Sequence, residues 1–327
     1  MKYTSSVLRN LYWSMEIDLH KDFTDIMKNR MLKIGVEPSN DKDCVYEYFN
    51  LLKRIVPQTP RIVKKSKEFN CPKEYEYALD EIEDKIVKGD SLIPFMSDSI
   101  LKPDFNDGLL NDWNIYHLHL TKRFRADGFA KRSDYELFVY FTEETAYFIQ
   151  IYPHNKKNLY STQDMVRIIY DNWPQLIEKN RINAVSLTQE IDDEAYGELR
   201  KANISTFVQI RENEIFGLIG GGYMSNGFST EALRSADHWY NLMKIREQVL
   251  IENVEFILRA IKQVNHTVNS DLDICLLWLD SDDKTTFLDK TNHVIIQLDF
   301  TDHIMRVCKP FEVFGFELGS IPPPKSY

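Results

Sequence analysis

Three segments that favour β-structure follow one another closely in the middle of the chain, and they constrain the fold more than any other feature. They span residues 113–120, 135–141 and 145–152, and all are rich in aromatic and β-branched side chains. Only residues 142–144 separate the second segment from the third, which is short enough for a hairpin. We therefore expect three consecutive antiparallel strands.

Helical patterns precede and follow this predicted sheet. Helices are expected within 8–15 and 45–52, from Lys73 to a stop at Gly89, and over 161–170, 193–201 and 230–264. Further strands are expected over 205–211, 272–279 and 293–300. We predict an α+β protein in three consecutive parts: a helical N-terminal region (1–70), a central antiparallel-sheet domain (71–160) and a C-terminal α/β domain (161–327).

The composition indicates a folded chain and excludes several classes of protein. Of 327 residues, 43% are hydrophobic and only 12 are glycine and 12 proline, which excludes disordered and collagen-like chains. The net charge of −10 argues against a surface that wraps nucleic acid throughout, although it is compatible with a local basic patch. Since neither an export signal nor a run of about 18 apolar residues is visible, we expect a cytoplasmic protein without a membrane partner.

The sequence carries no motif for a cofactor or a structural metal. Four cysteines lie far apart and form no CxxC pair, so they fit neither a zinc site nor a disulfide framework: Cys44, Cys71, Cys275 and Cys308. The phosphate-binding patterns GxxxxGK[ST] and GxGxxG are also absent. We therefore expect reduced thiols and no bound cofactor.

The most specific polar pair in the predicted strands is His117 and His119. Residues two apart on a strand point to the same face of a sheet, so the two imidazoles are expected side by side. His154 directly follows the third strand and reaches the same face if strand order follows the sequence. Such a group can bind a metal or perform acid–base chemistry near neutral pH. The alternative is a half-exposed sheet face whose histidines bond only to neighbours or water.

A basic loop begins immediately after the histidine pair. Residues 121–132 hold one acidic and five basic side chains, a net charge of +4: Lys122, Arg123, Arg125, Lys131 and Arg132. Together with Phe124 and Phe129 they could neutralise phosphates and stack on unpaired bases. The alternative is a mobile solvated loop. Cations beside imidazoles favour the first interpretation, because RNA cleavage by 2′-hydroxyl attack needs a base, an acid and a stabiliser of phosphate charge.

The order of these segments resembles that of RelE and ParE type toxins over about residues 73–160. A helical segment and Leu109–Trp113 precede the first strand, then come the basic loop, the hairpin strands and Pro153-His154. The resemblance implies a small sheet with helices on one face, and RNA cleavage without a metal. It further implies phosphate contacts from Arg123, Arg125, Lys131 and Arg132, and acid and base candidates at His117, His119, Tyr135 and His154.

A glycine-rich segment provides a second candidate site. Gly220, Gly221, Gly222 and Tyr223 lie between a predicted strand and the helix that begins near residue 230. Glycines let backbone N–H groups approach a phosphate, so this segment is a possible ligand or partner loop. A plain turn between strand and helix is the more ordinary interpretation.

Three hypotheses for function follow. The first is an RNA-cleaving or RNA-binding protein of toxin or phage-defence type, with RNA or a neutralising protein as its partner. The second is a non-enzymatic immunity or adaptor protein, which fits the net acidity. The third is a metal-dependent hydrolase that uses His117, His119 and His154 with a carboxylate.

Overall fold

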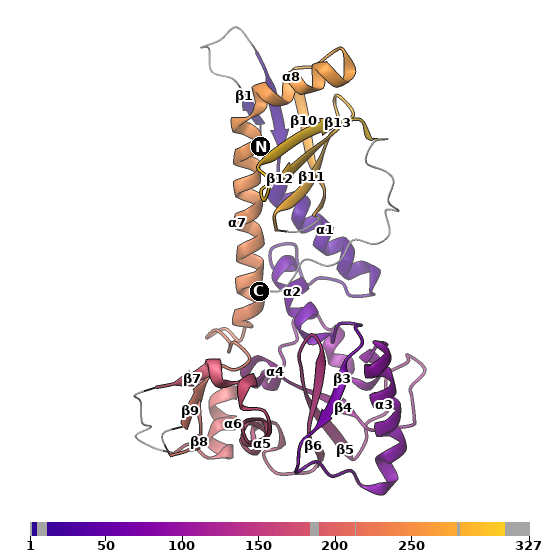
Figure 1. Ribbon diagram of the computed structural model, residues 1–327, viewed down its shortest axis with the longest axis vertical. Coiled ribbons are helices and arrows are strands. Elements are labelled where there is room, and N and C mark those ends of the chain that lie inside the picture. Colours follow the sequence, from indigo (N-terminus) through magenta and orange to yellow (C-terminus); the bar gives the residue numbers. More distant parts are fainter. Residues whose placement is uncertain (1, 5–11, 184–189, 213, 280–281, 311–327) are drawn as a thin grey trace. The chain divides into compact units, whose positions relative to one another are not determined.

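The computed structural model describes residues 2–4, 12–183, 190–212, 214–279 and 282–310 (Figure 1). Its helices and mixed sheets confirm the α+β class. The chain forms two compact units, Tyr46–Arg234 and a second one that combines Met1–Val45 with Ser235–Tyr327. We call these the inner unit and the terminal unit. Their boundaries fall inside two helices, α2 (Cys44–Arg54) and α7 (Thr230–Glu252).

The inner unit holds two sheets and several helices. Its strands are β3 (Ile62–Lys65), β4 (Ile115–His119), β5 (Tyr135–Phe141), β6 (Thr145–Pro153), β7 (Arg181–Ile182), β8 (Phe207–Arg211) and β9 (Glu214–Gly217). Its α-helices besides the ends of α2 and α7 are α3 (Glu76–Lys88), α4 (Gly108–Trp113), α5 (Asp164–Asn172) and α6 (Asp193–Lys201). Short 3-10 turns occupy Lys73–Tyr75, Ile93–Phe95, Asp98–Leu101, Leu159–Ser161, Pro174–Leu176 and Glu178–Asn180.

The three predicted central strands are antiparallel neighbours, as expected. The four-stranded sheet has the order β3-β6-β5-β4, and β3 joins it parallel to β6. The β4–β5 register places His119 opposite Glu136 and Leu118 opposite Leu137. β3 was not predicted from the sequence. Its four residues include two lysines, and pairing with a distant strand rather than apolar alternation holds it in the sheet.

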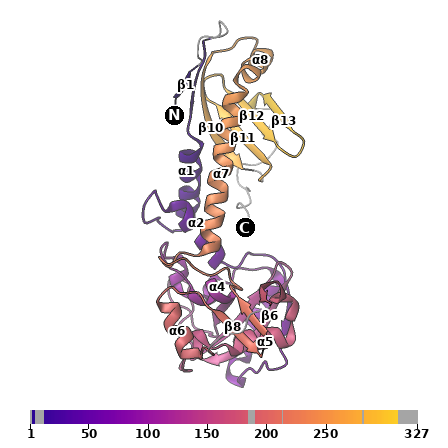
Figure 2. The same cartoon turned by 90° about the vertical axis from the view of Figure 1, so that its left-hand side faces the viewer.

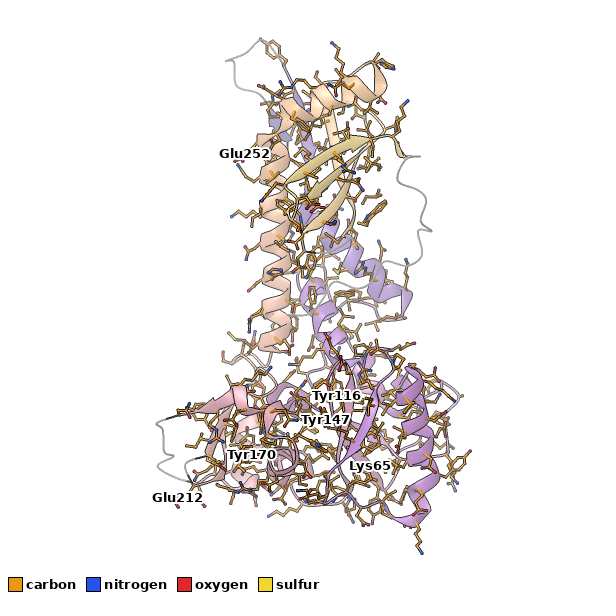
Figure 3. The ribbon with its side chains drawn as sticks, in the orientation of Figure 1. Lys65, Tyr116, Tyr147, Tyr170, Glu212 and Glu252 are labelled. Carbon is orange, nitrogen blue, oxygen red and sulfur yellow. The ribbon has the colours of Figure 1, made fainter. Side chains whose placement is uncertain are left out.

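Each face of this sheet covers its own apolar core. On one face, Leu118, Leu137 and Val139 pack with side chains of α3. On the other face, Ile115 and Phe138 pack with α5, α6 and the three-stranded sheet β7-β9-β8. Figure 1 shows α3 on one side of the strands and α5 with α6 on the other. Tyr116 and Tyr147, both labelled in Figure 3, belong to opposite faces.

The helix predicted from Lys73 ends at Gly89, as the sequence indicates. A 3-10 turn leads into α3, and Gly89 caps its end in the left-handed conformation with φ of 77°. A Cβ atom there would lie 2.6 Å from the backbone nitrogen of Pro60. Both the backbone angle and the close neighbour therefore require glycine at this position.

The terminal unit contains a six-stranded sheet with the order β1-β2-β10-β11-β12-β13. Its strands are β1 (Lys2–Thr4), β2 (Ser14–Ile17), β10 (Asp271–Leu279), β11 (Lys284–Asp289), β12 (Val294–Asp299) and β13 (Ile304–Cys308). Its helices are α1 (Leu19–Lys33), α8 (Val254–Asn265) and most of α7. The rings of Phe23 on α1 and Trp239 on α7 stack at 5.8 Å between centroids, and both helices lie beside the sheet in Figure 2.

Three sequence predictions about the ends of the chain differ from the structure. The helix expected around Met15 is wrong, because Ser14–Ile17 forms β2 and pairs in parallel with β10; Leu8 and Leu11 lie outside the described residues. The helix expected over 230–264 is two helices, which meet at Asn253. The two units also differ from the three consecutive parts expected, since strands from both ends of the chain share one sheet. A partner more than 250 residues away is invisible to local periodicity.

None of the helices in the described part of the chain is long and apolar enough to cross a membrane.

Candidate active site

Three polar side chains meet around the buried carboxylate of Glu136. His119 Nδ1 lies 3.4 Å from Glu136 Oε1, and His154 Nε2 lies 3.8 Å from the same oxygen. The Tyr160 hydroxyl donates a hydrogen bond of 2.8 Å to the other oxygen, Oε2. The side chain of Glu136 is only 1% exposed, whereas that of His154 is 43% exposed. The cluster therefore extends from the protein interior to its surface.

Strand geometry explains how Glu136 and His119 meet. Glu136 is the one charged residue of β5, and alternation places it on the same face as Phe138. The register sets it directly opposite His119 at the end of β4. Directly opposed side chains on neighbouring antiparallel strands lie close enough to interact.

A β-bulge brings His154 to the same face. The β5–β6 register slips between Phe138 and Val139, where one extra residue of β6 is accommodated. Before the bulge, Ile149 faces the core under α5, and after it Tyr152 faces the same core. Odd-numbered residues of β6 therefore point to this face before the bulge and even-numbered residues after it. His154 comes two residues after Tyr152 and so points to the same face. Its backbone N–H donates a 2.7 Å hydrogen bond to the carbonyl of Asp134. The bulge thus aims His154 at Glu136.

His117 has a carboxylate neighbour of its own. Its Nδ1 lies 3.8 Å from Oδ2 of Asp107, the N-cap residue of α4, whose Oδ1 accepts hydrogen bonds from the N–H groups of Leu109 and Leu110. The His117 ring also contacts that of Tyr160 edge-on, with 5.5 Å between centroids. His117 and His119 therefore share a face but lie next to different carboxylates.

The electrostatics favour a neutral His119 and a protonated Tyr160. Burial lowers the pKa of His119, and the positive charges of nearby groups including Arg132 add to this, against the opposing effect of Glu136. Burial and the neighbouring Glu136 carboxylate raise the pKa of Tyr160. Nδ1 of His119 faces the carboxylate, an arrangement that favours the tautomer with the proton on Nδ1 and the lone pair on Nε2. A neutral imidazole with a free Nε2 can act as a general base.

The basic loop folds back on itself as a short hairpin whose cations are exposed. A β-bridge joins Phe124 and Ala130, and the N–H of Arg125 donates to the carbonyl of Phe129 at 2.7 Å. The N–H of Ala130 also donates to the carbonyl of Pro94 at 2.6 Å. This hydrogen bond attaches the hairpin to the 3-10 turn Ile93–Phe95 of the same unit. Phe129 packs on the core below α3, so of the two loop aromatic residues it is not placed to stack on a base.

The five loop cations have different surroundings. Arg125 forms ion pairs with Asp98, at 2.6 Å, and with Asp127. The ammonium of Lys122 lies 4.1 Å from the centre of the Tyr77 ring. Arg132 is close enough to His119 and Tyr160 to influence both. Arg123, Lys131 and Arg132 are all exposed, and of these three Arg132 is the one whose charge acts on His119 and Tyr160.

Tyr135 does not join the cluster. It precedes Glu136 on β5, so its side chain points to the opposite face, where its ring lies 5.0 Å from that of Tyr75. The tyrosine whose hydroxyl reaches Glu136 is Tyr160, which lies in the turn before α5.

The glycine-rich segment is a close packing contact rather than an open anion site. The N–H groups of Gly220, Gly221 and Gly222 donate to the backbone carbonyls of Asp112, Leu218 and Asn111, and that of Tyr223 donates to Ser205 Oγ. A Cβ atom on Gly220 would lie 2.6 Å from the carbonyl oxygen of Asn111. These donors are therefore already used, and the glycines let the segment approach the end of α4.

A resident metal ion finds no ligand set in this cluster. Across the described ranges of the chain, no group of three or more His, Cys, Asp or Glu side chains is arranged to hold one. His117 turns toward Asp107 while His119 and His154 turn toward Glu136, so the three imidazoles do not converge on one point. The four cysteines, all of which are described, form no disulfide bond.

Sequence reasoning missed two residues of the cluster, Glu136 and Tyr160, and also Asp107 beside His117. Glu136 could have been found, because a single carboxylate in the otherwise uncharged strand Tyr135–Phe141 needs a polar partner. Asp107 carries the ordinary signal of an N-cap, and nothing local distinguishes Tyr160 from the other 16 tyrosines of the chain.

No protein-family model, curated protein or solved structure gives a match to this chain.

Proposed function

We propose that the protein is a metal-independent endoribonuclease whose active site is the cluster of His117, His119, His154, Glu136 and Tyr160. The observation that carries this proposal is the pair of imidazoles from different strands that share the buried Glu136 carboxylate. One imidazole is buried and neutral and the other is exposed to water. Two imidazoles with different environments are suited to act as base and acid in one reaction.

The reaction needs no metal because RNA carries its own nucleophile. His119 Nε2 removes the proton of a 2′-hydroxyl group, and the oxygen attacks the adjacent phosphorus. A bond between 2′-oxygen and phosphorus forms while the bond from phosphorus to the 5′-oxygen breaks. The imidazolium of His154 gives its proton to the departing 5′-oxygen, leaving a 2′,3′-cyclic phosphate and a 5′-hydroxyl. Arg132, whose charge acts on both His119 and Tyr160, supplies the positive charge that stabilises the phosphate.

The remaining groups orient this pair. Glu136 contacts both imidazoles through Oε1 and accepts a hydrogen bond from Tyr160 at Oε2. A buried carboxylate that holds the ring of a catalytic histidine fixes both its tautomer and its direction. Asp107 is the carboxylate neighbour of His117, which flanks the pair on β4.

The test compares wild type with three single variants, His117→Asn, His119→Asn and His154→Asn. Each protein is incubated with a single-stranded RNA and with a DNA of the same sequence. Both reactions are run with and without EDTA. The matched control is His303→Asn, because His303 is exposed on a turn of the terminal unit with φ of 52°, a conformation that Asn tolerates well. We expect EDTA-resistant cleavage of RNA alone, cyclic phosphate ends, and loss of about 10²-fold or more in His119→Asn and His154→Asn.

Three results would reject the proposal. The first is no cleavage of any RNA by the wild type. The second is full activity in both His119→Asn and His154→Asn. The third is cleavage that EDTA abolishes, which would indicate a metal-dependent hydrolase instead.

A further inference from the structure

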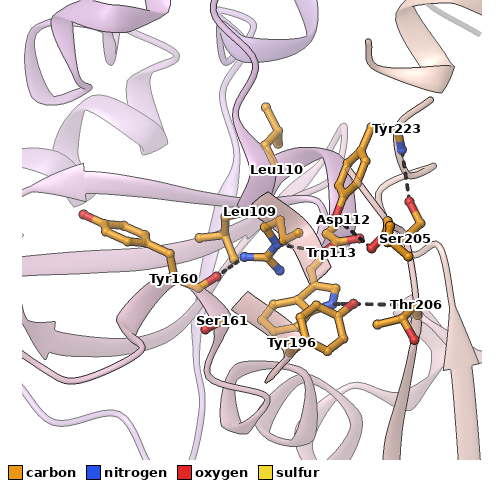
Figure 4. Close-up of polar contacts among 12 residues, drawn as sticks. Leu109, Leu110, Asp112, Trp113, Tyr160, Ser161, Tyr196, Ser205, Thr206 and Tyr223 are labelled. Carbon is orange, nitrogen blue, oxygen red and sulfur yellow. Dashed lines mark hydrogen bonds and ion pairs between the residues drawn. The ribbon is translucent and has the colours of Figure 1, made fainter. Parts of the chain in front are cut away.

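A single arginine links both sides of the histidine cluster without belonging to it. Arg200 lies in the last turn of α6, and its Nε donates a 2.8 Å hydrogen bond to Oδ2 of Asp112 at the end of α4. Its guanidinium also donates to the backbone carbonyl of Tyr160 (Figure 4). Asp112 is fully buried and the Arg200 side chain is 11% exposed, so water screens these contacts little.

Two aromatic rings and a glycine also surround the guanidinium and its aliphatic stem. Its centre lies 4.7 Å from the ring of Trp113 and 5.3 Å from that of Tyr196. Its aliphatic part passes over Gly108, where a Cβ atom would lie 2.9 Å from Arg200 Cδ. A planar donor with two directed bonds and two aromatic neighbours has essentially one arrangement available.

Arg200 binds two segments, and each of them carries a side chain that contacts the polar cluster. The Tyr160 carbonyl belongs to the residue whose hydroxyl donates to Glu136. Asp112 lies in the last turn of the short helix α4, and Asp107, which faces His117, is the N-cap of the same helix. The turn that carries Tyr160 has a second attachment, because Ser161 Oγ donates to the carbonyl of Asp193 at 2.7 Å.

We propose that Arg200 is a positioning residue of the active site, because its joint hold on Asp112 and on the Tyr160 carbonyl keeps the Tyr160 hydroxyl on Glu136. This inference rests on the proposed function for its effect on the reaction, but the placement of Tyr160 can be measured without any activity.

The placement has a spectroscopic consequence at His119. A hydroxyl group that donates to Glu136 reduces the negative charge that His119 experiences. Loss of that hydrogen bond leaves a stronger anion beside the imidazole, so the pKa of His119 rises. Tyr160→Phe removes the bond directly. Arg200→Lys keeps a positive charge for Asp112 but cannot bind both acceptors with the geometry of a guanidinium.

The experiment is a double-mutant cycle on the full chain with Arg200→Lys, Tyr160→Phe and the combined variant. Arg211→Lys is the matched control, since Arg211 is an exposed arginine of β8 paired with Asp171. The readouts are the pKa of His119 from NMR titration of its ring protons, the pH profile of kcat, and urea unfolding. We expect both single variants to raise the His119 pKa and to lower kcat about tenfold, the effect of one hydrogen bond to a charged group.

The combined variant decides the matter. If Arg200 acts through Tyr160, the double variant has the same His119 pKa and the same kcat as Tyr160→Phe alone. Additive changes would overturn the proposal, and so would an Arg200→Lys protein that is less stable but has the wild-type titration and pH profile. Should Arg200→Lys fail to fold, Gly108→Ala displaces the same side chain without removing its charge, and it is expected to shift the His119 titration in the same direction.

The titration also separates this inference from the proposed function. A wild type that cleaves no RNA would reject the ribonuclease, while the His119 pKa in the cycle would still show whether Arg200 places Tyr160. Conversely, active wild-type enzyme with an additive cycle would reject only the role of Arg200.

Discussion

The two faces of the central sheet use the same strands for different purposes. Leu137 and Glu136 are neighbours on β5, yet Leu137 packs into the apolar core under α3 while Glu136 lies among imidazoles on the other face. Both side chains are fully buried. Burial alone therefore does not distinguish a face that stabilises the fold from a face that carries reactive groups. The neighbours of each buried side chain make that distinction. The following four predictions test this comparison.

The largest effect is expected from removal of the shared carboxylate. Glu136→Gln keeps the shape of the side chain and an acceptor for Tyr160, but it removes the charge that orients two imidazoles. We expect kcat for RNA cleavage to fall by about 10²-fold or more. Urea unfolding at neutral pH checks that the fold is retained. Activity within about twofold of wild type would mean that the polar face has no catalytic role.

The reciprocal change on the other face should affect stability instead. Leu137→Ala leaves a cavity in the core under α3 and is expected to cost about 2–5 kcal/mol of the free energy of unfolding. Below the unfolding transition, kcat per folded molecule should match that of wild type. Urea unfolding together with initial rates provides both numbers. A large loss of kcat in the folded protein would show that the two faces are coupled.

The stability of the polar face should depend on pH in a defined direction. Burial lowers the pKa of His119, with contributions from His117, His154 and Arg132 and against the effect of Glu136. The unfolded chain therefore takes up a proton near pH 6.5 while the folded chain does not. Stability from this group is present above that pH and is lost as the pH falls, by at most about 1.4 kcal/mol per pH unit.

His119→Asn removes this dependence. Urea unfolding of wild type and variant between pH 5 and 8 should give curves that approach each other as the pH falls below about 6.5. Parallel curves across the whole range would contradict a lowered pKa for His119. His303→Asn, on an exposed turn, serves as the control.

The smallest effect is expected from single substitutions of two cations of the basic hairpin, which should differ in their effect on RNA binding. Arg132 is close to the histidine cluster, whereas Arg125 is paired with Asp98 and Asp127. We expect Arg132→Ala to weaken RNA binding and to reduce the slope of log affinity against log salt by about 1, the effect of one phosphate contact. Arg125→Ala should leave that slope unchanged and cost about 0.2–1 kcal/mol in stability. Equal slopes for the two variants would remove Arg132 from the site.

Local pattern was sufficient for much of the inner unit. The central strands and their antiparallel order follow from aromatic and β-branched runs with a short hairpin, and the end of α3 follows from Lys88 and Gly89. The common face of His117 and His119 follows from the two-residue period of a strand. These features depend only on neighbours in the sequence, and for that reason they could be predicted.

The features that were missed depend on distant partners. β2 was expected to be helical, but it pairs with β10 across the length of the chain. The glycine-rich segment was a candidate for phosphate binding, but two of its N–H groups donate to carbonyls near the end of α4 and the other two donate to Leu218 and Ser205. Tyr135 and Tyr160 are of the same residue type, and only the fold places Tyr160 on Glu136.

By itself, the sequence determined which strands and helices form in the middle of the chain and that two imidazoles share one face of a strand. The tertiary structure alone decided that Glu136 lies opposite His119, that the bulge in β6 turns His154 toward the same carboxylate, and that Tyr160 completes the group. The physical reason is that backbone periodicity is set by neighbouring residues, whereas register, bulges and turns depend on packing between segments far apart in the chain.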